Sequence, residues 1–269
     1  METTRKWTMR TSIFISVLLL IASCKTQSNQ SITEKSELYT QAFYEALRYK
    51  MSGNYERALE LFNKCVKENP NDDASHFAIA QISLIQGNVE EAKTRTILAS
   101  QKDVNNHYYK IELAQIYRKL GDFEQGASIF EKIILDYPSN PNYYFEAAMC
   151  WEKAGKISKA IQTINNLEAS TGKNIEATLK KHHWYKSEGK LKEAEKELTS
   201  YLERDSGNEF VMATLVDFYL NSGQIKKGIE QLKELVELNP KNGRGLLLLA
   251  QFEYENEDLN KAEDYYVKA

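Results

Sequence analysis

Apolar side chains return along this chain at the spacing of one face of an α-helix. In residues 55–62, for example, Tyr55, Ala58 and Phe62 are apolar, whereas charged residues occupy most of the positions between them. Steps of three and four residues place these side chains along one side of a helix, so that this side packs and the other meets water. The pattern recurs over residues 39–269 and predicts an all-α fold.

A second regularity is a gapless 34-residue period. Six of the 12 glycines occupy one register, which we call the turn position: Gly53, Gly87, Gly121, Gly155, Gly189 and Gly223. Glu257 takes the seventh place. Because glycine readily adopts the left-handed conformation that ends a helix, each turn position predicts the junction between the two helices of a hairpin.

Other residues keep the same register. Tiny residues stand five places after the turn position: Ala58, Ala92, Gly126, Ala160, Ala194, Gly228 and Ala262. Mostly small residues stand seven places before it: Ala46, Ala80, Ala114, Ala148, His182, Val216 and Ala250. The residues directly after the turn position that can cap a second helix are Asn54, Asn88, Asp122 and Asp258. Small residues on facing helices predict a close approach of the two helices of each hairpin.

Taken together, these positions resemble the tetratricopeptide repeat family over residues 36–269. The resemblance implies an α-solenoid of antiparallel helical hairpins, in which stacked neighbours bury the apolar face that one hairpin cannot bury alone. The hairpins are expected near residues 39–72, 73–106, 107–140, 141–174, 175–208, 209–242 and 243–269. The last of these is incomplete and shows no polar cap, so we expect either a longer parent chain, which we favour, or a partner that covers this end.

The first residues have the pattern of a processing signal. Arg5, Lys6 and Arg10 precede an apolar run over residues 13–22, which is too short to span a bilayer comfortably as a helix. The run ends at small residues directly before Cys24, an arrangement that resembles a bacterial lipoprotein box. The resemblance implies a signal peptide over residues 1–23 and a lipid on Cys24.

The alternative is an ordinary secretory signal with an incidental cysteine. Under the lipoprotein interpretation, residues 24–38 form a flexible polar tether, and the acyl chains hold the protein to the bilayer. The absence of an acidic residue beside Cys24 favours the outer membrane, by a sorting habit of this protein class. We therefore expect an outer-membrane anchor, with the solenoid facing the periplasm or exposed at the surface.

Composition and charge narrow the range of partners. The chain is 42% hydrophobic and 27% charged with only 4 prolines, which is typical of a folded protein. Its formal net charge is −3, and removal of a basic signal segment makes the mature chain more acidic. Such a balance argues against nucleic acid as a partner.

Candidate catalytic chemistry is missing from the sequence. It contains no zinc-protease, nucleophile-elbow or phosphate-loop motif, so we expect no enzyme activity and no cofactor. His182 and His183 are adjacent and diverge on a helix, so packing or surface roles are expected instead of metal ligation. Cys65 and Cys150 are expected to be small buried hydrophobes without a disulfide between them.

The resemblance places binding on the first helix of each hairpin. Ten places before the turn position stands a mostly apolar series: Phe43, Phe77, Ile111, Phe145, Leu179, Ala213 and Leu247. Six places before it stands a more polar series: Leu47, Gln81, Gln115, Met149, His183, Asp217 and Gln251. From these we select as candidate partner-binding residues Phe43, Phe77, Gln81, Ile111, Gln115, Phe145 and Met149. The alternative is that the apolar series only packs between repeats.

The resulting functional hypothesis is a membrane-anchored scaffold or adaptor. Its partners would be other proteins or peptides of the cell envelope, within an envelope assembly or secretion machine, and it would contact the bilayer through acylated Cys24. A structural tether without a defined client is the second hypothesis, and a mostly polar groove would favour it. An enzyme is the third. The sequence leaves the oligomeric state and the identity of the machine open.

Overall fold

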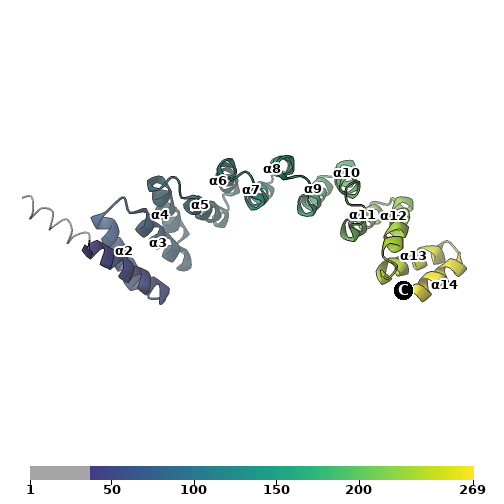
Figure 1. The fold of residues 1–269 in the computed structure, drawn as a ribbon, viewed down its shortest axis with the longest axis horizontal. Helices are drawn as coiled ribbons and strands as arrows, with labels where there is room; N and C mark the ends of the chain where they lie inside the picture. Colours follow the sequence, from purple (N-terminus) through teal and green to yellow (C-terminus); the bar gives the residue numbers. More distant parts are fainter. Residues whose placement is uncertain (1–36) are drawn as a thin grey trace, which may run out of the picture. The chain divides into compact units, whose positions relative to one another are not determined.

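The computed structural model describes residues 37–269, and every regular element in that range is an α-helix (Figure 1), which confirms the predicted fold class. The helices are residues 37–51, α2 (Tyr55–Glu68), α3 (Asp73–Ile85), α4 (Val89–Lys102), α5 (His107–Lys119), α6 (Phe123–Asp136), α7 (Pro141–Lys153), α8 (Ile157–Thr171), α9 (Ile175–Ser187), α10 (Leu191–Leu202), α11 (Glu209–Asn221), α12 (Ile225–Leu238), α13 (Gly243–Glu255) and α14 (Leu259–Lys268). The predicted lipidation site Cys24 and the signal segment lie outside the described residues.

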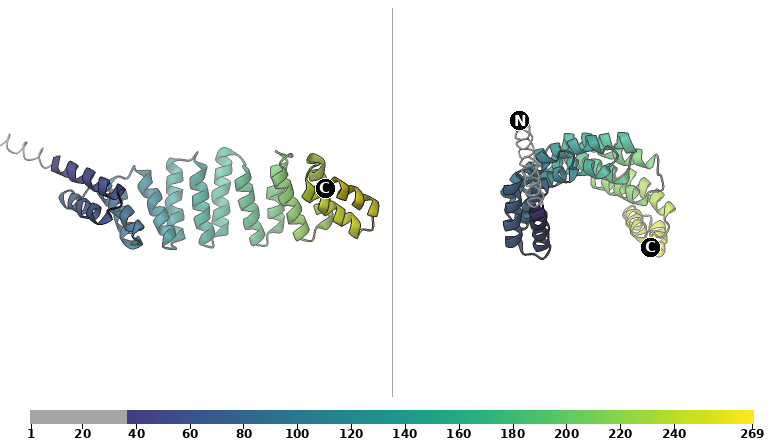
Figure 2. Two further views of the ribbon diagram at one scale, coloured as in Figure 1. Left: turned by 90° about the horizontal axis from the view of Figure 1, so that it is seen from below. Right: turned by 60° about the vertical axis from the view of Figure 1, so that its left-hand side comes forward.

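The chain divides into two compact units. The described part of the first unit, residues 37–122, contains helix 37–51 and α2 to α5. The second unit, residues 123–269, contains α6 to α14. Within each unit, successive numbered helices pack against one another, as Figure 2 shows. We call helix 37–51 and the odd-numbered helices the first helices of their hairpins, and the even-numbered helices the second helices.

The turn positions have the predicted backbone conformation. All six glycines of the register have positive φ angles, between +70° and +81°. Glu257 also has a positive φ, +63°, and is the one non-glycine residue with this conformation among residues 37–269. A side chain in the left-handed region costs roughly 1–2 kcal/mol. The period therefore imposes the same turn on the seventh hairpin even where glycine is absent.

The small positions lie where the helices approach closely. The tiny residues five places after the turn position are buried in every hairpin, and so are the residues seven places before it. A Cβ atom added at Gly228 would come within 2.6 Å of the Leu220 side chain, although that contact is with the end of a flexible side chain. The small residues are thus buried, as the predicted close approach requires, and the contact at Gly228 confirms it for α11 and α12.

Side-chain capping differs in part from the prediction. Asn54 and Asp258 cap α2 and α14, because their side chains accept hydrogen bonds from the backbone N–H groups of Arg57 and Lys261. The prediction was wrong for Asn88, whose side chain accepts no such bond at the start of α4. Acidic residues in the first turn of α4 instead complement the positive end of the helix dipole.

Asparagines also cap the first helices, in a register that the sequence reasoning missed. Their side chains accept hydrogen bonds from backbone N–H groups of the first turn in α5, α7, α9, α11 and α13. The residues, each 15 places before a turn position, are Asn106, Asn140, Asn174, Asn208 and Asn242. Asparagine is among the best residues at this position, so the period also specifies where first helices begin.

A single layer of buried side chains joins each hairpin to the next. Nine places after the turn position, side chains are at most 1% exposed in the six earlier hairpins: Phe62, Thr96, Phe130, Ile164, Leu198 and Leu232. Leu232 on α12 packs in one cluster with Leu246 and Leu249 on the following first helix, α13. Each second helix is thus covered by the first helix of the next hairpin, as expected for a stacked array.

One interface contains buried charge. Lys181 on α9 is only 2% exposed and stands eight places before its turn position, where Leu215 and Leu249 occupy the equivalent sites of α11 and α13. Its Nζ lies 2.6 Å from Oε2 of Glu168 on α8 and 2.8 Å from Oε2 of Glu197 on α10. Burial lowers the pKa of Lys181, but the two carboxylates outweigh this effect and hold the pKa above its ordinary value.

The histidine pair and the two cysteines of the repeats were predicted to have packing or surface roles. His182 is buried, its Nδ1 lies 2.9 Å from the carbonyl oxygen of Ala194, and its ring meets Phe218 edge-on. His183 is exposed, so the prediction that the two histidines diverge is confirmed. Cys65 and Cys150 are both buried and are not joined by a disulfide, again as predicted.

Candidate protein-binding surface

The two predicted series lie on one face of each first helix, because residues four apart on a helix are neighbours. In the first unit this face carries Phe43, Phe77 and Ile111, and all three side chains are half-buried. In the second unit Phe145 on α7 and Met149 one turn later are half-buried as well. Half-burial is compatible both with packing between hairpins and with contact to a partner.

The rings of the first unit are engaged in packing. Phe77 on α3 lies against Tyr109 of α5, with ring centroids 4.6 Å apart. Tyr109 in turn donates a hydrogen bond of 2.8 Å to Oδ2 of Asp73. Burial, followed by this bond to a carboxylate, holds the pKa of Tyr109 well above its ordinary value. Phe43 meets Phe62 on α2, within its own hairpin, edge-on at 5.8 Å. In this unit the apolar series therefore contributes to packing within a hairpin at Phe43 and between hairpins at Phe77.

The polar candidates of the first unit differ in their surroundings. The Gln81 side-chain oxygen accepts a hydrogen bond from Nζ of Lys50 on the preceding first helix. Gln115 on α5 is exposed. The structure thus brings Gln81 into a contact between successive first helices, and it leaves Gln115 at the surface.

An open recess of about 440 Å³ lies on the same face of the second unit. It includes Leu179 and His183, which are the members of the two series on α9, and extends to Glu152 on α7. Its full lining is Glu152, Ile175, Glu176, Leu179, Lys180, His183 and Trp184. Glu152 follows the predicted Met149 by three residues on α7, so the recess adjoins the predicted residues without including them.

A smaller recess of about 50 Å³ is lined by residues of α11, α12 and α13 together with Asn242. It includes Ala213 and Asp217, the next members of the two series. Asp217 forms an ion pair with Arg244 on α13, with 3.4 Å between the nitrogen and oxygen. Members of the two series on α9 and on α11 therefore line recesses, the first recess extending toward α7 and the second toward α13.

The larger recess has an apolar floor and a charged rim. Ile175, Leu179 and the buried Trp184 supply the apolar surface, whereas Glu176 and Lys180 on the same helix supply charge. Such a site can accept an apolar side chain and orient the polar groups beside it. The sequence reasoning missed the rim residues, although their spacing on α9 places them beside Leu179.

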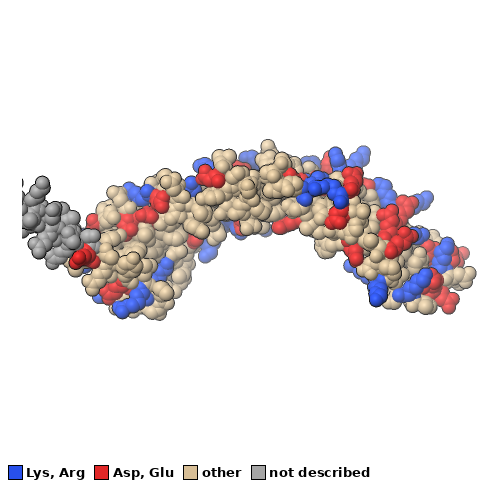
Figure 3. All heavy atoms as spheres, viewed as in Figure 1, with Lys and Arg blue, Asp and Glu red and all other residues tan. Residues whose placement is uncertain are grey.

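No group of three or more metal-ligating side chains comes together among residues 37–269. None of the helices in this range has the length and apolar character needed to cross a bilayer. On the face shown in Figure 3, acidic and basic side chains are interspersed over the second unit and form no continuous basic stripe.

Comparison with known families agrees with the repeat geometry. Family models described as tetratricopeptide repeat match residues 50–116 and 186–252, and a further one matches residues 111–174. The chain belongs to the tetratricopeptide repeat family. Proteins of this family bind other proteins or peptides and are generally non-catalytic scaffolds.

Individual relatives are distant. The chain is 22% identical over 80% of its length to the TPR repeat-containing protein YpiA of Bacillus subtilis, and it spans about half (51%) of that protein. A tetratricopeptide repeat protein from Parabacteroides merdae superposes with a TM-score of 0.51 at 14% identity, over 86% of this chain and 91% of that one. The Naa15/Naa10 complex bound to HypK-THB gives a TM-score of 0.55 at 17% identity, over 86% of this chain and 38% of that chain. These likenesses establish the fold.

Proposed function

We propose that this tetratricopeptide repeat protein is a scaffold that binds a peptide segment of a partner protein along the first helices of its second unit. The recess at Leu179 carries this proposal, because it coincides with the register of the two predicted series and combines an apolar floor with a charged rim. A purely structural spacer needs no such hollow. We propose no catalytic role, since the family generally acts through binding.

Anchoring and location are a further part of the proposal. The lipoprotein-like segment before Cys24 supports a lipid anchor in the outer membrane, with the repeats facing the periplasm or the surface. The partners would then be proteins of the cell envelope, within an assembly or secretion machine. This part rests on the sequence alone.

The binding face can be tested by truncating its apolar side chains. Leu179→Ala and Phe145→Ala are expected to weaken binding to a partner recovered with the intact anchored protein by about 2 kcal/mol, or roughly thirtyfold, if they contact a hot spot. Thermal melts should change little, because neither side chain is fully buried. Isothermal titration calorimetry with the purified partner measures the effect. Leu135→Ala provides the matched control, since Leu135 is an 81% exposed leucine on a second helix.

Phe77→Ala tests whether the apolar series of the first unit packs between hairpins or contacts a partner. Because this ring packs on Tyr109, we expect its loss to lower the melting temperature more than the loss of Phe145. Unchanged partner binding by Leu179→Ala and Phe145→Ala, in variants that fold normally, would show that recognition lies on another face.

The anchor has a separate test. Cys24→Ser is expected to move the protein from the membrane fraction to the soluble fraction or to leave its signal segment uncleaved, because serine cannot carry the thioether-linked lipid. Fractionation and mass spectrometry of the mature N-terminus measure both outcomes. An unmodified Cys24 in the mature wild-type protein would contradict the proposed anchor.

A further inference from the structure

The apolar series of the first helices has one much smaller member, Ala213 on α11. Ten places before every other turn position stands a phenylalanine, an isoleucine or a leucine, whereas the side chain of Ala213 is a single methyl group. Ala213 lines the smaller recess, of about 50 Å³. A side chain this short leaves free the space that a larger member of the series would enter.

The floor of the smaller recess reaches the core of the second unit. Val216, Leu232 and Leu235 line it, and all three are buried members of one apolar cluster. Because liquid water occupies about 30 Å³ per molecule, this recess has room for roughly one or two methyl-sized groups and not for an aromatic ring. The recess therefore suits a small apolar side chain.

Charged groups stand at the rims of both recesses. Asp217 and Arg244 line the smaller one, and their side chains are 50% and 79% exposed. An ion pair this exposed contributes at most about 1 kcal/mol, so its two groups can exchange partners at little cost. The rim of the larger recess likewise has an ammonium group on Lys180 and carboxylates on Glu152 and Glu176.

An extended peptide backbone complements both rims. Each residue of a peptide has an N–H donor and a C=O acceptor, which a helix bonds internally and an isolated extended segment does not. The carboxylates at the rims can accept hydrogen bonds from the N–H groups, and Lys180 and Arg244 can donate to the C=O groups. The rims therefore favour an extended segment over a helix.

The two recesses lie about two helix spacings apart. The larger extends from α9 toward α7, and the smaller extends from α11 toward α13. The helices α9 and α11 are in direct contact, since the rings of His182 and Phe218 meet edge-on. Packed helices lie about 8–10 Å apart, which places the recesses roughly 16–20 Å apart.

This separation sets the spacing of the side chains that would fill both recesses. At about 3.3 Å per residue, an extended segment covers the distance in roughly five or six residues. Successive side chains of such a segment point to opposite sides, so two that point the same way are separated by an even number of residues. The spacing is therefore about six residues.

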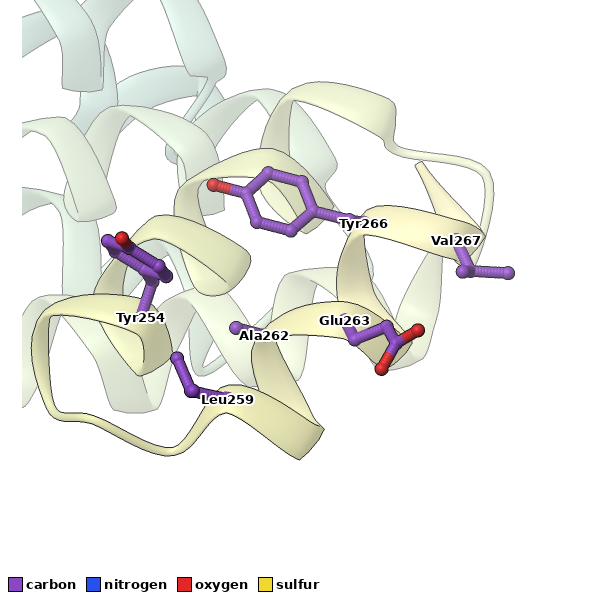
Figure 4. Close-up of a pocket in the computed structure, with 6 residues that line it drawn as sticks. All are labelled: Tyr254, Leu259, Ala262, Glu263, Tyr266 and Val267. Atoms are coloured by element: carbon purple, nitrogen blue, oxygen red, sulfur yellow. The ribbon is translucent and has the colours of Figure 1, made fainter.

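A further open hollow, of about 400 Å³, lies on α13 and α14. Figure 4 shows Tyr254 and Tyr266 of its lining on either side of Ala262. The members of the two predicted series all lie in the described range, and none of them contributes to this lining. The hollow is therefore separate from the two recesses of the groove.

We propose that the partner segment binds in an extended conformation through two apolar anchors. A large apolar side chain enters the recess at Leu179, and a small one, such as that of alanine or valine, enters the recess at Ala213 about six residues away. This inference rests on the proposed function and adds the chemistry of the partner. Ala213 then determines specificity, because its size decides whether the second anchor has a site.

Selection from a peptide library tests the spacing on the whole chain. The probe is a phage-displayed library of random peptides of about 16 residues, which is long enough for extended and helical spacings. Peptides enriched on the wild-type protein are expected to share a large and a small apolar residue about six positions apart, in either order. A shared spacing of about 11–13 residues would contradict the proposal, because a helix needs that many residues to cover the same distance.

Substitutions at the smaller recess test the second anchor. Ala213→Leu fills this recess and is expected to weaken binding of an enriched peptide about tenfold, as measured by fluorescence anisotropy. Replacing the small anchor of the peptide with glycine should weaken binding to the wild type but should have little further effect on Ala213→Leu. Ala169→Leu is the matched control, since Ala169 is exposed on α8. Ala213→Val adds less volume and replaces Ala213→Leu if that variant melts at a lower temperature.

The outcomes separate this inference from the proposed function. Equal binding by the wild type and Ala213→Leu, or enrichment of a large anchor alone, would overturn the second anchor. The proposed groove would survive that result if Leu179→Ala still weakened binding. Absence of any enriched peptide, or binding that Leu179→Ala leaves unchanged, would overturn both.

Discussion

Replacing Lys181 with methionine is expected to destabilise the second unit by about 3–5 kcal/mol, because it removes one partner of a buried ionic cluster. The Glu168 and Glu197 carboxylates would then remain at an interface where the side chain between them is only 2% exposed. Methionine matches the length of the lysine stem, so lost volume contributes little. Chemical denaturation followed by circular dichroism measures the change, and Lys186→Met on the exposed side of α9 is the control.

The pH dependence of the same variant gives a second readout. The variant has no ammonium group at this position, so its stability should not show the alkaline loss that Lys181 causes in the wild-type protein. In the wild-type protein the raised pKa of Lys181 contributes stability that is lost only as the pH rises above the ordinary lysine value of about 10.4.

A compensated variant completes this test. Lys181→Leu combined with Glu168→Leu and Glu197→Leu removes the whole cluster, and such replacements are often neutral or stabilising. Stability near that of the wild type is expected. If the Lys181→Met variant were as stable as the wild type at pH 7, the cluster would be solvated and its burial would have no energetic consequence.

The second large effect is expected from Phe130→Ala on α6, with a loss of about 3–5 kcal/mol from the cavity that remains. Phe130 is 1% exposed in the layer that joins a second helix to the next first helix. Hydrogen exchange by mass spectrometry should show faster opening of α6 and α7, because an array of repeats depends on each neighbouring interface.

Thr96→Ala is the matched control, since Thr96 occupies the same register on α4 and is also buried. Its Oγ1 has no hydrogen-bond partner among residues 37–269, so truncation removes an unsatisfied polar atom together with one methyl group. The net loss should be about 1 kcal/mol or less. Equal losses for the two variants would contradict the cavity as the cause of the Phe130→Ala loss.

The sequence was sufficient for the fold because one period specifies several local structures at once. The glycines at the turn position adopt the expected left-handed conformation, and the tiny residues such as Ala58 and Ala160 are buried, as a close approach of helices requires. The caps of the first helices also repeat with this period, from Asn106 to Asn242, and could have been found in the same way. Asn88 shows the limit of the method, because a suitable residue at a cap position does not guarantee the bond.

The candidate site was less predictable because it depends on how side chains of neighbouring repeats fill space. A large ring at the selected register can pack against the next first helix and so fill the space that a partner would enter. Phe77 does this when it packs on Tyr109. The smaller Leu179 leaves a recess beside Glu152 of the preceding first helix. Likewise, a lone Lys181 in the sequence gives no sign of its two carboxylate partners, which come from the helices on either side of α9. Such contacts follow from the stacking and not from the period.

Glu257 shows how a single backbone angle can order the unfolding of a repeat array. Its left-handed conformation costs roughly 1–2 kcal/mol, and the six glycines at equivalent positions avoid this cost. Because the strain is confined to one turn, it weakens the α13–α14 hairpin without weakening the hairpins before it. Opening of the array is therefore biased to begin at this hairpin and to proceed toward α6. The position of one missing glycine thus gives the unfolding of the second unit a direction.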